Sequence, residues 1–271
     1  MDALTIGVQL LAGALIGACI GMTGIGGGVL ILPVLTLGFG LPSTVAVGTA
    51  HLYSFLCKLP AVFFHFKQGT VRLRTSLYFL VGALPVTVAV AFWITGYVGS
   101  MEQEDPAWFE LQENLRKFIA TVVILSGLMI LWHMLIRHKA QALEGRKSSS
   151  PYSCSKIVLV ALLGAVIGGL IAATSVGSGI LIVPLMIIIF GLSAVDTVGS
   201  SIFVALVLTF TSSIIYVGTS QVDFAVSLTM AAGSLIGVPA GVRMSRKIPE
   251  RYLQIIITGL VLTAGVFMLI G

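Results

Sequence analysis

Charged residues are scarce in this sequence: only 9% of its 271 residues are Asp, Glu, Lys or Arg, whereas 57% are hydrophobic. A soluble domain carries roughly 25% charged residues. A chain with so few charges and a mean hydropathy of +1.09 cannot cover a water-facing surface. The composition therefore excludes an ordinary soluble protein and predicts an integral membrane protein.

Other features are missing as well. Alternating strand patterns are absent, which excludes a membrane β-barrel. The first residues, MDALTIGVQL, lack the basic segment of a signal peptide, so the first apolar run is interpreted as a retained helix. The three cysteines have no metal-ligand spacing. We therefore predict no cofactor, no metal site and no nucleic-acid partner, and we attribute the net charge of +5 to membrane topology.

One glycine-rich stretch occurs twice, as TGIGGGVLILP at 23–33 and TSVGSGILIVP at 174–184. The offset between the copies, 151 residues from Pro33 to Pro184, also aligns Gly13 with Gly164. A constant offset over this distance indicates an internal repeat. We predict two transmembrane repeats, 1–136 and 156–271, joined by a charged, serine-rich cytoplasmic linker at 137–155.

Apolar runs long enough to span a bilayer as helices recur in the same order in both repeats. In the first repeat the long runs are Leu4 to Met22, Thr44 to Phe66, Ser76 to Val98 and Phe118 to Ile136. In the second they are Ile157 to Ala173, Val195 to Val217, Phe224 to Val242 and Tyr252 to Ile270. Each repeat also has one run that is too short to span, Val29 to Phe39 and Ile180 to Phe190. A polar loop is expected before the fourth long run, with Glu102, Glu104, Asp105, Glu110 and Glu113.

The basic residues predict the topology, because cytoplasmic loops are enriched in Lys and Arg. They gather in the loop at 67–74, in the linker and in the loop at 243–251, whereas the loop after Val98 is acidic. Equivalent loops of the two halves then fall on opposite sides of the membrane. We predict an all-α membrane protein with two inverted-topology repeats, each a glycine-broken helical hairpin plus three transmembrane helices. Both termini are predicted outside.

The two glycine-rich breaks are candidate anion sites. Glycine lets the backbone approach a ligand closely, and a helix N-terminus that follows such a break attracts negative charge. Two inverted copies would direct two such ends at one site. The alternative is that the glycines serve only close helix packing. The predicted binding residues at the breaks are Thr23, Gly24, Gly26, Gly27, Gly28, Thr174, Ser175, Gly177, Ser178 and Gly179.

The run 44–66 adds polar residues at membrane depth. Lys58 is the only Lys or Arg inside an apolar run. A buried cation in a membrane helix is costly and would attract an anion, unless its stem reaches back to the interface. His51 would carry a proton or would simply hydrogen-bond a neighbouring helix. Thr49, Ser200 and Ser201 either line the same cavity or only pack helices.

The TGIGGGVLILP stretch, the AVGTA run at 46–50 and the HFKQG loop at 65–69 resemble the TauE/SafE family, also called the sulfite exporter or 4-toluene sulfonate uptake permease family. The resemblance covers nearly the whole chain. It implies a multi-pass permease of the bacterial plasma (inner) membrane for sulfite, sulfoacetate or other organosulfonates. The family motif falls on the glycines of both breaks and on Pro33 and Pro184, and its GTS-like helix start falls on Thr49 and on Ser200–Ser201. Ala50 stands where the family often has Ser, and Ser175 and Ser178 replace glycines.

Together these observations predict a secondary transporter that moves a small sulfur-containing anion by alternating access. His51 would carry a coupling proton, the lipid bilayer is the surrounding partner, and a homodimer is compatible with the sequence. An anion channel, or a transporter for an unrelated carboxylate or oxyanion, is the alternative. An intramembrane enzyme is disfavoured, because the apolar runs hold no Glu and Asp196 is expected to act as a helix N-cap. No catalytic residue is predicted.

Overall fold

Every regular element in the described part of the chain is a helix. The computed structural model describes residues 3–23, 28–102, 104–140, 154–176, 179, 181–190, 192–245 and 250–270. The elements are α1 (Ala3–Thr23), α2 (Gly28–Pro33), η1 (Val34–Gly38), α3 (Ser43–Lys67), α4 (Leu73–Gly99), α5 (Pro106–Ala140), α6 (Cys154–Thr174), α7 (Ile182–Phe190), α8 (Ala194–Gly218), α9 (Phe224–Ser245) and α10 (Glu250–Ile270).

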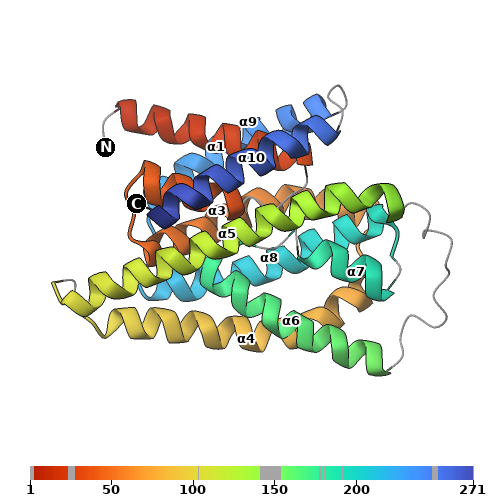
Figure 1. Ribbon diagram of the computed structural model, residues 1–271, viewed down its shortest axis with the longest axis horizontal. Helices are drawn as coiled ribbons and strands as arrows, with labels where there is room; N and C mark the ends of the chain where they lie inside the picture. Colours follow the sequence, from red (N-terminus) through yellow and green to blue (C-terminus); the bar gives the residue numbers. More distant parts are fainter. Residues whose placement is uncertain are drawn as a thin grey trace.

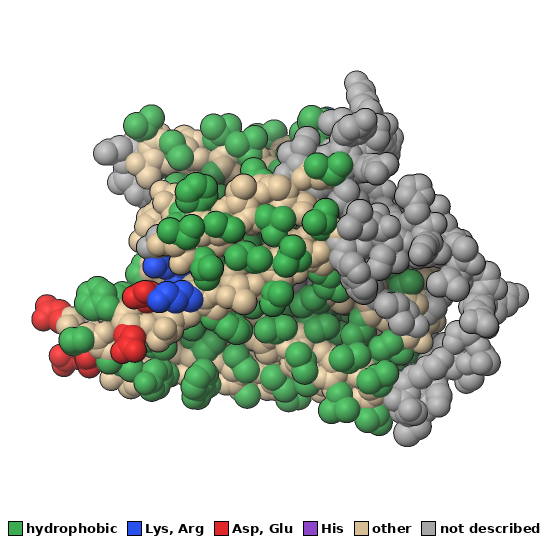
Figure 2. All heavy atoms as spheres, in the orientation of Figure 1, with side chains coloured by type: hydrophobic (Ala, Val, Ile, Leu, Met, Phe, Trp, Pro, Cys, Tyr) green, Lys and Arg blue, Asp and Glu red, His purple; other side chains and the backbone are tan. Residues whose placement is uncertain are grey.

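Seven of the described helices are long and apolar enough to span a bilayer: α1, α3, α4, α5, α6, α8 and α9. The prediction of an all-helical membrane protein is therefore confirmed for the described residues. The apolar segment Gly28–Gly38, which joins α2 and η1, is shorter, as its 11 residues require. Large apolar side chains such as Trp93 and Ile236 are 70% and 76% exposed and form the surface that lipid would cover. Figure 2 shows hydrophobic side chains over much of one face, with acidic and basic ones at its left end.

One predicted boundary is wrong. The polar loop was expected to include Glu110 and Glu113, but α5 already begins at Pro106. Proline is favoured in the first turn of a helix, and Asp105 caps this turn by accepting a hydrogen bond from Ala107 N–H at 2.8 Å. The first turns of α5 are thus helical although they are polar.

The two ends of the helix bundle carry different connections (Figure 1). Both chain termini and the α4–α5 connection lie at the left end of this view, whereas α6 begins at the right end. α1 starts beside the N-terminus at the left and runs to the right. The chain therefore enters the two hairpins, α1–α2 and α6–α7, from opposite ends of the bundle.

Helices of one half pack on helices of the other half. α1 packs mainly along α9, and α6 packs mainly along α4. Gly13 of α1 lies against the backbone of Met230, and Gly164 of α6 lies against the backbone of Phe79. The 151-residue offset relates the two contacts. Gly13 corresponds to Gly164 (13 plus 151), and Phe79 corresponds to Met230 (79 plus 151). A side chain larger than hydrogen at either glycine would separate the helices.

The short helix α2 lies inside the protein. Its residues from Gly28 to Pro33 are all buried, and Leu35 of η1 is fully buried too. They join one apolar core with residues of α3, α5 and α10. The short helix that follows the first glycine-rich stretch is therefore surrounded by protein.

Candidate functional site

The predicted site residues divide into described and undescribed positions. Gly24, Gly26, Gly27, Gly177 and Ser178 lie outside the described residues. Thr23 is the last residue of α1, and only its backbone is described. The structure places the side chains or backbone of Gly28, Thr49, His51, Lys58, Thr174, Ser175, Gly179, Ser200 and Ser201.

The two breaks touch each other. Gly28 begins α2, and Ser175 follows the last residue of α6. A Cβ atom built on Gly28 would overlap the carbonyl oxygen of Ser175 and would also crowd Val176 N. Glycine is therefore required at position 28 for the start of α2 to approach the end of α6 this closely. This contact brings together residues that are 147 positions apart (175 minus 28).

The end of α6 is set by Ser175. Its φ of 52° is left-handed, a conformation that non-glycine residues rarely adopt. Its N–H donates to the Ile171 carbonyl at 2.6 Å, and Val176 N–H turns to the Thr174 hydroxyl at 3.2 Å instead of a carbonyl four residues back. The carbonyl of Ala172 is consequently left without its intrahelical donor.

His51 and Tyr216 supply the missing donors. Nε2 of His51 lies 3.2 Å from the Ala172 carbonyl oxygen, and the Tyr216 hydroxyl donates to the same oxygen at 3.1 Å. Because a carbonyl only accepts, His51 Nε2 carries the proton in this bond. The two rings lie 5.6 Å apart, and both side chains are fully buried. α3 and α8 thus meet at the break of α6.

Several buried polar atoms near this point have no hydrogen-bond partner among the described residues. They are Nδ1 of His51, Oγ of Ser54 and Oγ of Ser175. His51 and Ser54 are three residues apart and share one face of α3. Buried polar groups are normally satisfied by protein or water. Among the described residues, His51, Ser54 and Ser175 therefore have spare hydrogen-bonding capacity.

Lys58 continues the same face of α3. Its residue surface is only 9% exposed, so the side chain is enclosed by protein. Nζ has one weak bond, to the Ser54 carbonyl at 3.5 Å. The two salt bridges of the described residues, Arg72–Asp196 and Lys117–Glu113, do not involve it. Lys58 is therefore a buried cation without an acidic partner in the described part of the chain.

Other predicted residues already hold backbone groups. The Thr49 hydroxyl accepts a hydrogen bond from Asp223 N–H at 2.9 Å, and the Ser200 hydroxyl accepts one from Arg72 N–H at 2.9 Å. These bonds are equivalent under the 151-residue offset, and each tethers the loop before a helix of the other half. Thr49 and Ser200 thus stabilise contacts between the two halves. The participation of these two residues in substrate binding stays a prediction.

Two further hydroxyls bond to their own helices. Thr174 Oγ1 donates to the Leu170 carbonyl at 2.6 Å, and Ser201 Oγ donates to the Val198 carbonyl at 2.9 Å. Gly179 accepts a long backbone bond from Val183 N–H at 3.4 Å. His51 is thus tied to the end of α6 by its bond to Ala172, whereas Ser201 bonds within its own helix, α8.

The predicted N-cap at the start of α8 is wrong by three residues. Ser193 is the N-cap, and its hydroxyl accepts from Asp196 N–H at 3.1 Å. Asp196 lies in the first turn of α8, three residues after the N-cap, and forms an ion pair with Arg72 at 2.9 Å. Serine followed three residues later by an acid resembles a capping box, which explains the shift.

Three residues with buried or half-buried side-chain hydrogen bonds were not among the residues predicted from the sequence: Tyr216, Gln112 and Gln221. Tyr216 is the offset partner of His65, and a tyrosine within an apolar run is the signal that was available. Gln112 and Gln221 form a second buried network with Thr44. Thr44 Oγ1 donates to Gln221 Oε1 at 2.8 Å, and Gln112 Nε2 donates to Thr44 Oγ1 at 3.0 Å. This network fixes the start of α3 to α5 and to the loop before α9.

Comparison with known proteins agrees with this picture. The family model for the sulfite exporter TauE/SafE matches residues 9–268. The chain is 29% identical over 257 residues to the probable membrane transporter protein YjnA of Bacillus subtilis strain 168, covering 94% of this chain and 96% of that protein. It is 22% identical over 274 residues to a probable membrane transporter protein of Methanocaldococcus jannaschii, covering 96% of this chain and 94% of that protein.

No solved structure is significantly similar to the chain. In the described part of the chain, no three His, Cys, Asp or Glu side chains are grouped so that they could hold a metal ion. The resemblance seen in the glycine-rich motifs is confirmed by the family match, which covers nearly the whole chain, and the family consists of transporters and not of enzymes. This chain belongs to the TauE/SafE sulfite exporter family of membrane transporters.

Proposed function

We propose that the protein is a secondary transporter that moves a small sulfur-containing anion, such as sulfite, sulfoacetate or another organosulfonate, across the bacterial plasma membrane. The observation that carries the proposal is a set of buried polar groups on α3 and at the end of α6. Lys58 supplies a positive charge, while Ser54 and Ser175 supply hydroxyl groups without partners. An oxyanion is the ligand class that accepts from all of them.

The energetic argument rests on Lys58. A buried, unpaired cation costs several kcal/mol or neutralises. A bound anion would offset this cost and would pair with the charge in a site of low dielectric. The predicted contribution of the helix N-termini at the two breaks adds to this attraction, and it stays a prediction because most of the glycines are undescribed.

The alternating-access part of the proposal rests on two related halves. Reciprocal contacts support inverted-topology repeats: Gly13 lies on Met230 where Gly164 lies on Phe79. The opposite directions from which the chain enters the two hairpins in Figure 1 support the same relation. The Gly28–Ser175 contact then lies where the halves meet, so a small relative rotation would open the site to one side or the other.

The substrate class comes from the family. The family is that of sulfite exporters, whereas the names of the two relatives specify only probable membrane transporters. A sulfonate or sulfite carries several acceptor oxygens, which suits the mixed cation and hydroxyl donors. The alternatives are an anion channel and a carrier for an unrelated carboxylate or oxyanion.

Coupling and topology complete the proposal. His51 Nδ1 is the free ring nitrogen of a histidine whose other nitrogen holds the α6 carbonyl. It would bind a coupling proton beside the anion. We place both termini outside, from the distribution of basic loops. A homodimer remains compatible with the proposal.

Anion binding by the purified protein in detergent tests the function. Sulfite, sulfoacetate, taurine, thiosulfate and sulfate would be titrated by calorimetry, with chloride as the control anion. We expect saturable binding of at least one sulfur anion, and at least a tenfold loss of affinity in Lys58→Gln. Lys117→Gln is the matched control, because Lys117 is half exposed and paired with Glu113.

Transport in proteoliposomes separates the alternatives. A carrier shows saturable flux that is stimulated by substrate on the opposite side, whereas a channel shows conductance without counterflow. The folded wild-type protein could bind a carboxylate or phosphate but none of the sulfur anions. That result would overturn the proposed substrate class and leave the proposal of a carrier standing. Equal losses of affinity in Lys58→Gln and Lys117→Gln would remove the proposed site.

A further inference from the structure

A cavity lies between α3 and α9. Its volume is about 620 Å³, and it is lined by Cys57, Pro60, Ala61, Phe64, His65, Ser234, Leu235, Val238, Pro239 and Arg243. The two helices touch at its inner end, where Cys57 Sγ lies 2.9 Å from Ser234 Oγ. Both helices then continue in the same direction, α3 to His65 and α9 to Arg243. The cavity is thus a groove between two parallel helices.

The groove exists because its middle is lined by short side chains. Pro60 and Ala61 face it from α3, and Val238 and Pro239 face it from α9. At 1.5 Å per residue, the stretch from Ser234 to Arg243 is roughly 13 Å long. None of these four side chains is long enough to fill the space between the helices.

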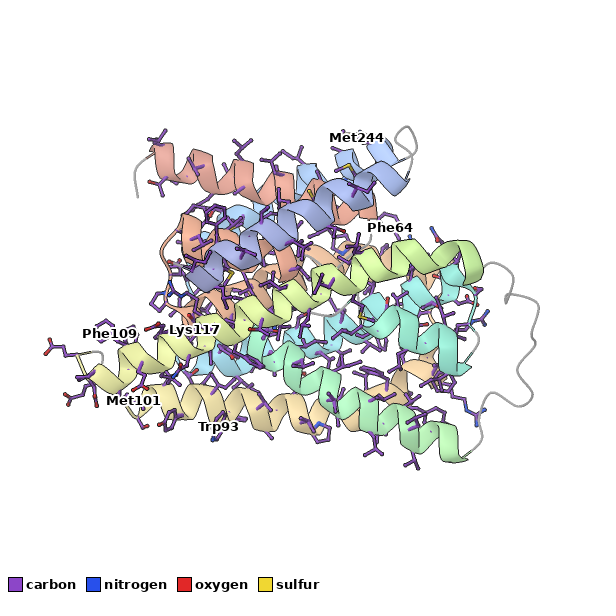
Figure 3. The ribbon with its side chains drawn as sticks, viewed as in Figure 1. Phe64, Trp93, Met101, Phe109, Lys117 and Met244 are labelled. Carbon is purple, nitrogen blue, oxygen red and sulfur yellow. The ribbon has the colours of Figure 1, made fainter. Side chains whose placement is uncertain are left out.

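The groove opens towards lipid. Phe64 and Leu235 belong to its lining and are 60% and 63% exposed, and Met244 beside it is 46% exposed. Figure 3 shows Phe64 and Met244 at the same end of the bundle. In a chain that spans the membrane, exposed side chains of this kind contact hydrocarbon. A small hydrophilic anion would not enter from that side.

The outer end of the groove carries a cation, Arg243. Arg243 lies in the last turn of α9 and is exposed, and His65 lies in the last turn of α3. No acidic side chain is among the described residues that line the groove. Lys67 ends α3, Arg72 lies in the loop to α4 and is paired with Asp196, and Arg74 lies in the first turn of α4. Such a cluster attracts the anionic lipids of the cytoplasmic leaflet.

We propose that this groove binds one anionic phospholipid, with its phosphate on the Arg243 guanidinium and an acyl chain along the proline-lined wall. Guanidinium groups bind phosphate through two parallel hydrogen bonds. The hydrocarbon chain replaces the side chains that the short residues leave out. The bound lipid then forms part of the contact between α9 and α3, the helix that carries His51 and Lys58.

The other half of the protein lacks this arrangement. The positions related by the 151-residue offset are Thr211 for Pro60, Val88 for Pro239 and Phe92 for Arg243. The cation and both prolines are therefore particular to the α3–α9 side and are not a consequence of the repeat. A site of this kind makes the two faces of a symmetric scaffold respond differently to lipid.

Competition between lipids tests the proposal. The purified, delipidated full chain would be mixed with equal amounts of phosphatidylglycerol and phosphatidylcholine with identical acyl chains, and bound lipid would be counted by native mass spectrometry. We expect wild-type protein to retain at least threefold more phosphatidylglycerol. Arg243→Ala should bring the ratio close to one, and Ala61→Trp should displace both lipids. Arg243→Lys keeps the charge but loses the two parallel hydrogen bonds, so it should keep only part of the preference.

Lys117→Ala is the control, because Lys117 lies towards the opposite end of the bundle (Figure 3). Equal retention of the two lipids by wild-type protein would overturn the proposal, as would equal losses of preference in Arg243→Ala and Lys117→Ala. Unchanged lipid binding in Ala61→Trp would place the lipid elsewhere. Displacement of the phospholipid by millimolar inorganic phosphate would assign the end of the groove to a soluble anion. None of these readouts depends on substrate transport.

Discussion

His51 and Tyr216 donate to one and the same oxygen, the carbonyl of Ala172, although they come from different halves of the chain. The carbonyl is free because Ser175 ends α6 in a left-handed conformation. A histidine and a tyrosine thus perform the task that a backbone N–H performs inside a helix.

Tyr216→Phe should remove one of these two bonds with little change in volume. Since His51 still satisfies the carbonyl, we expect a loss of ~1 kcal/mol in unfolding free energy. Thermal unfolding in detergent measures this change. His51→Phe in the Tyr216→Phe background should cost more than the sum of the single changes, because Ala172 O would then be buried without a donor. Additive losses would show that the shared acceptor is not the reason for the pairing.

Gly28→Ala should destabilise the protein by ~1–3 kcal/mol, the usual cost of forcing an extra group into a packed interior. The new methyl group would overlap the Ser175 carbonyl oxygen. Gly96→Ala is the control, since a Cβ there meets nothing within 4 Å. That variant should gain stability, by up to ~1 kcal/mol, from the higher helix propensity of alanine. Equal melting temperatures for the two variants would contradict the close approach of the breaks.

Lys58→Met should raise stability and lower anion affinity at once. Methionine has a similar length and removes an unpaired charge from a buried position. We expect a higher melting temperature without ligand and at least a tenfold weaker anion affinity by calorimetry. Lys117→Met, at a side chain that is 50% exposed, should change neither quantity appreciably. A drop in the melting temperature of Lys58→Met would mean that Lys58 has a stabilising partner in the fold.

Ser175→Gly tests strain against binding. The left-handed φ of 52° costs ~1–2 kcal/mol for a non-glycine residue, so glycine should be more stable by about that amount. The variant also removes a buried hydroxyl that we assign to the anion, so affinity should fall. Ser220→Gly is the matched control, because Ser220 has a similar φ of 57° on the exposed surface. It should gain stability with unchanged affinity, and parallel behaviour of both variants would remove Ser175 from the site.

Labelling with an impermeant thiol reagent tests the topology. In a background without the native cysteines Cys19, Cys57 and Cys154, single cysteines would be placed at Met1, within 141–150 and at Gly271. We expect labelling of both terminal positions in intact cells, and of the central position only after the membrane is opened. Termini labelled on different sides would contradict a scaffold in which N and C share one end of the bundle.

The helices were predictable because spanning helices need long apolar runs, and α3 and α8 follow the predicted ranges within one residue. The start of α5 was missed because its first turns carry Glu110 and Glu113, and hydropathy reports burial in lipid rather than helicity. Of the candidate site, Lys58 and His51 stood out as polar groups in an apolar run. The role of Tyr216 could not be read from the chain, since it depends on where α6 ends in space.

The exchange of partners between the halves also constrains how the protein is made. Met230 is synthesised 217 residues after Gly13, the glycine that it covers (230 minus 13). During translation α1 therefore enters the bilayer long before its main packing partner exists, and contacts so distant in sequence close slowly. Until α9 is inserted, the glycine face of α1 is left to lipids or to membrane chaperones. A chain truncated before α9 should consequently be a substrate for membrane proteases rather than a half-active carrier.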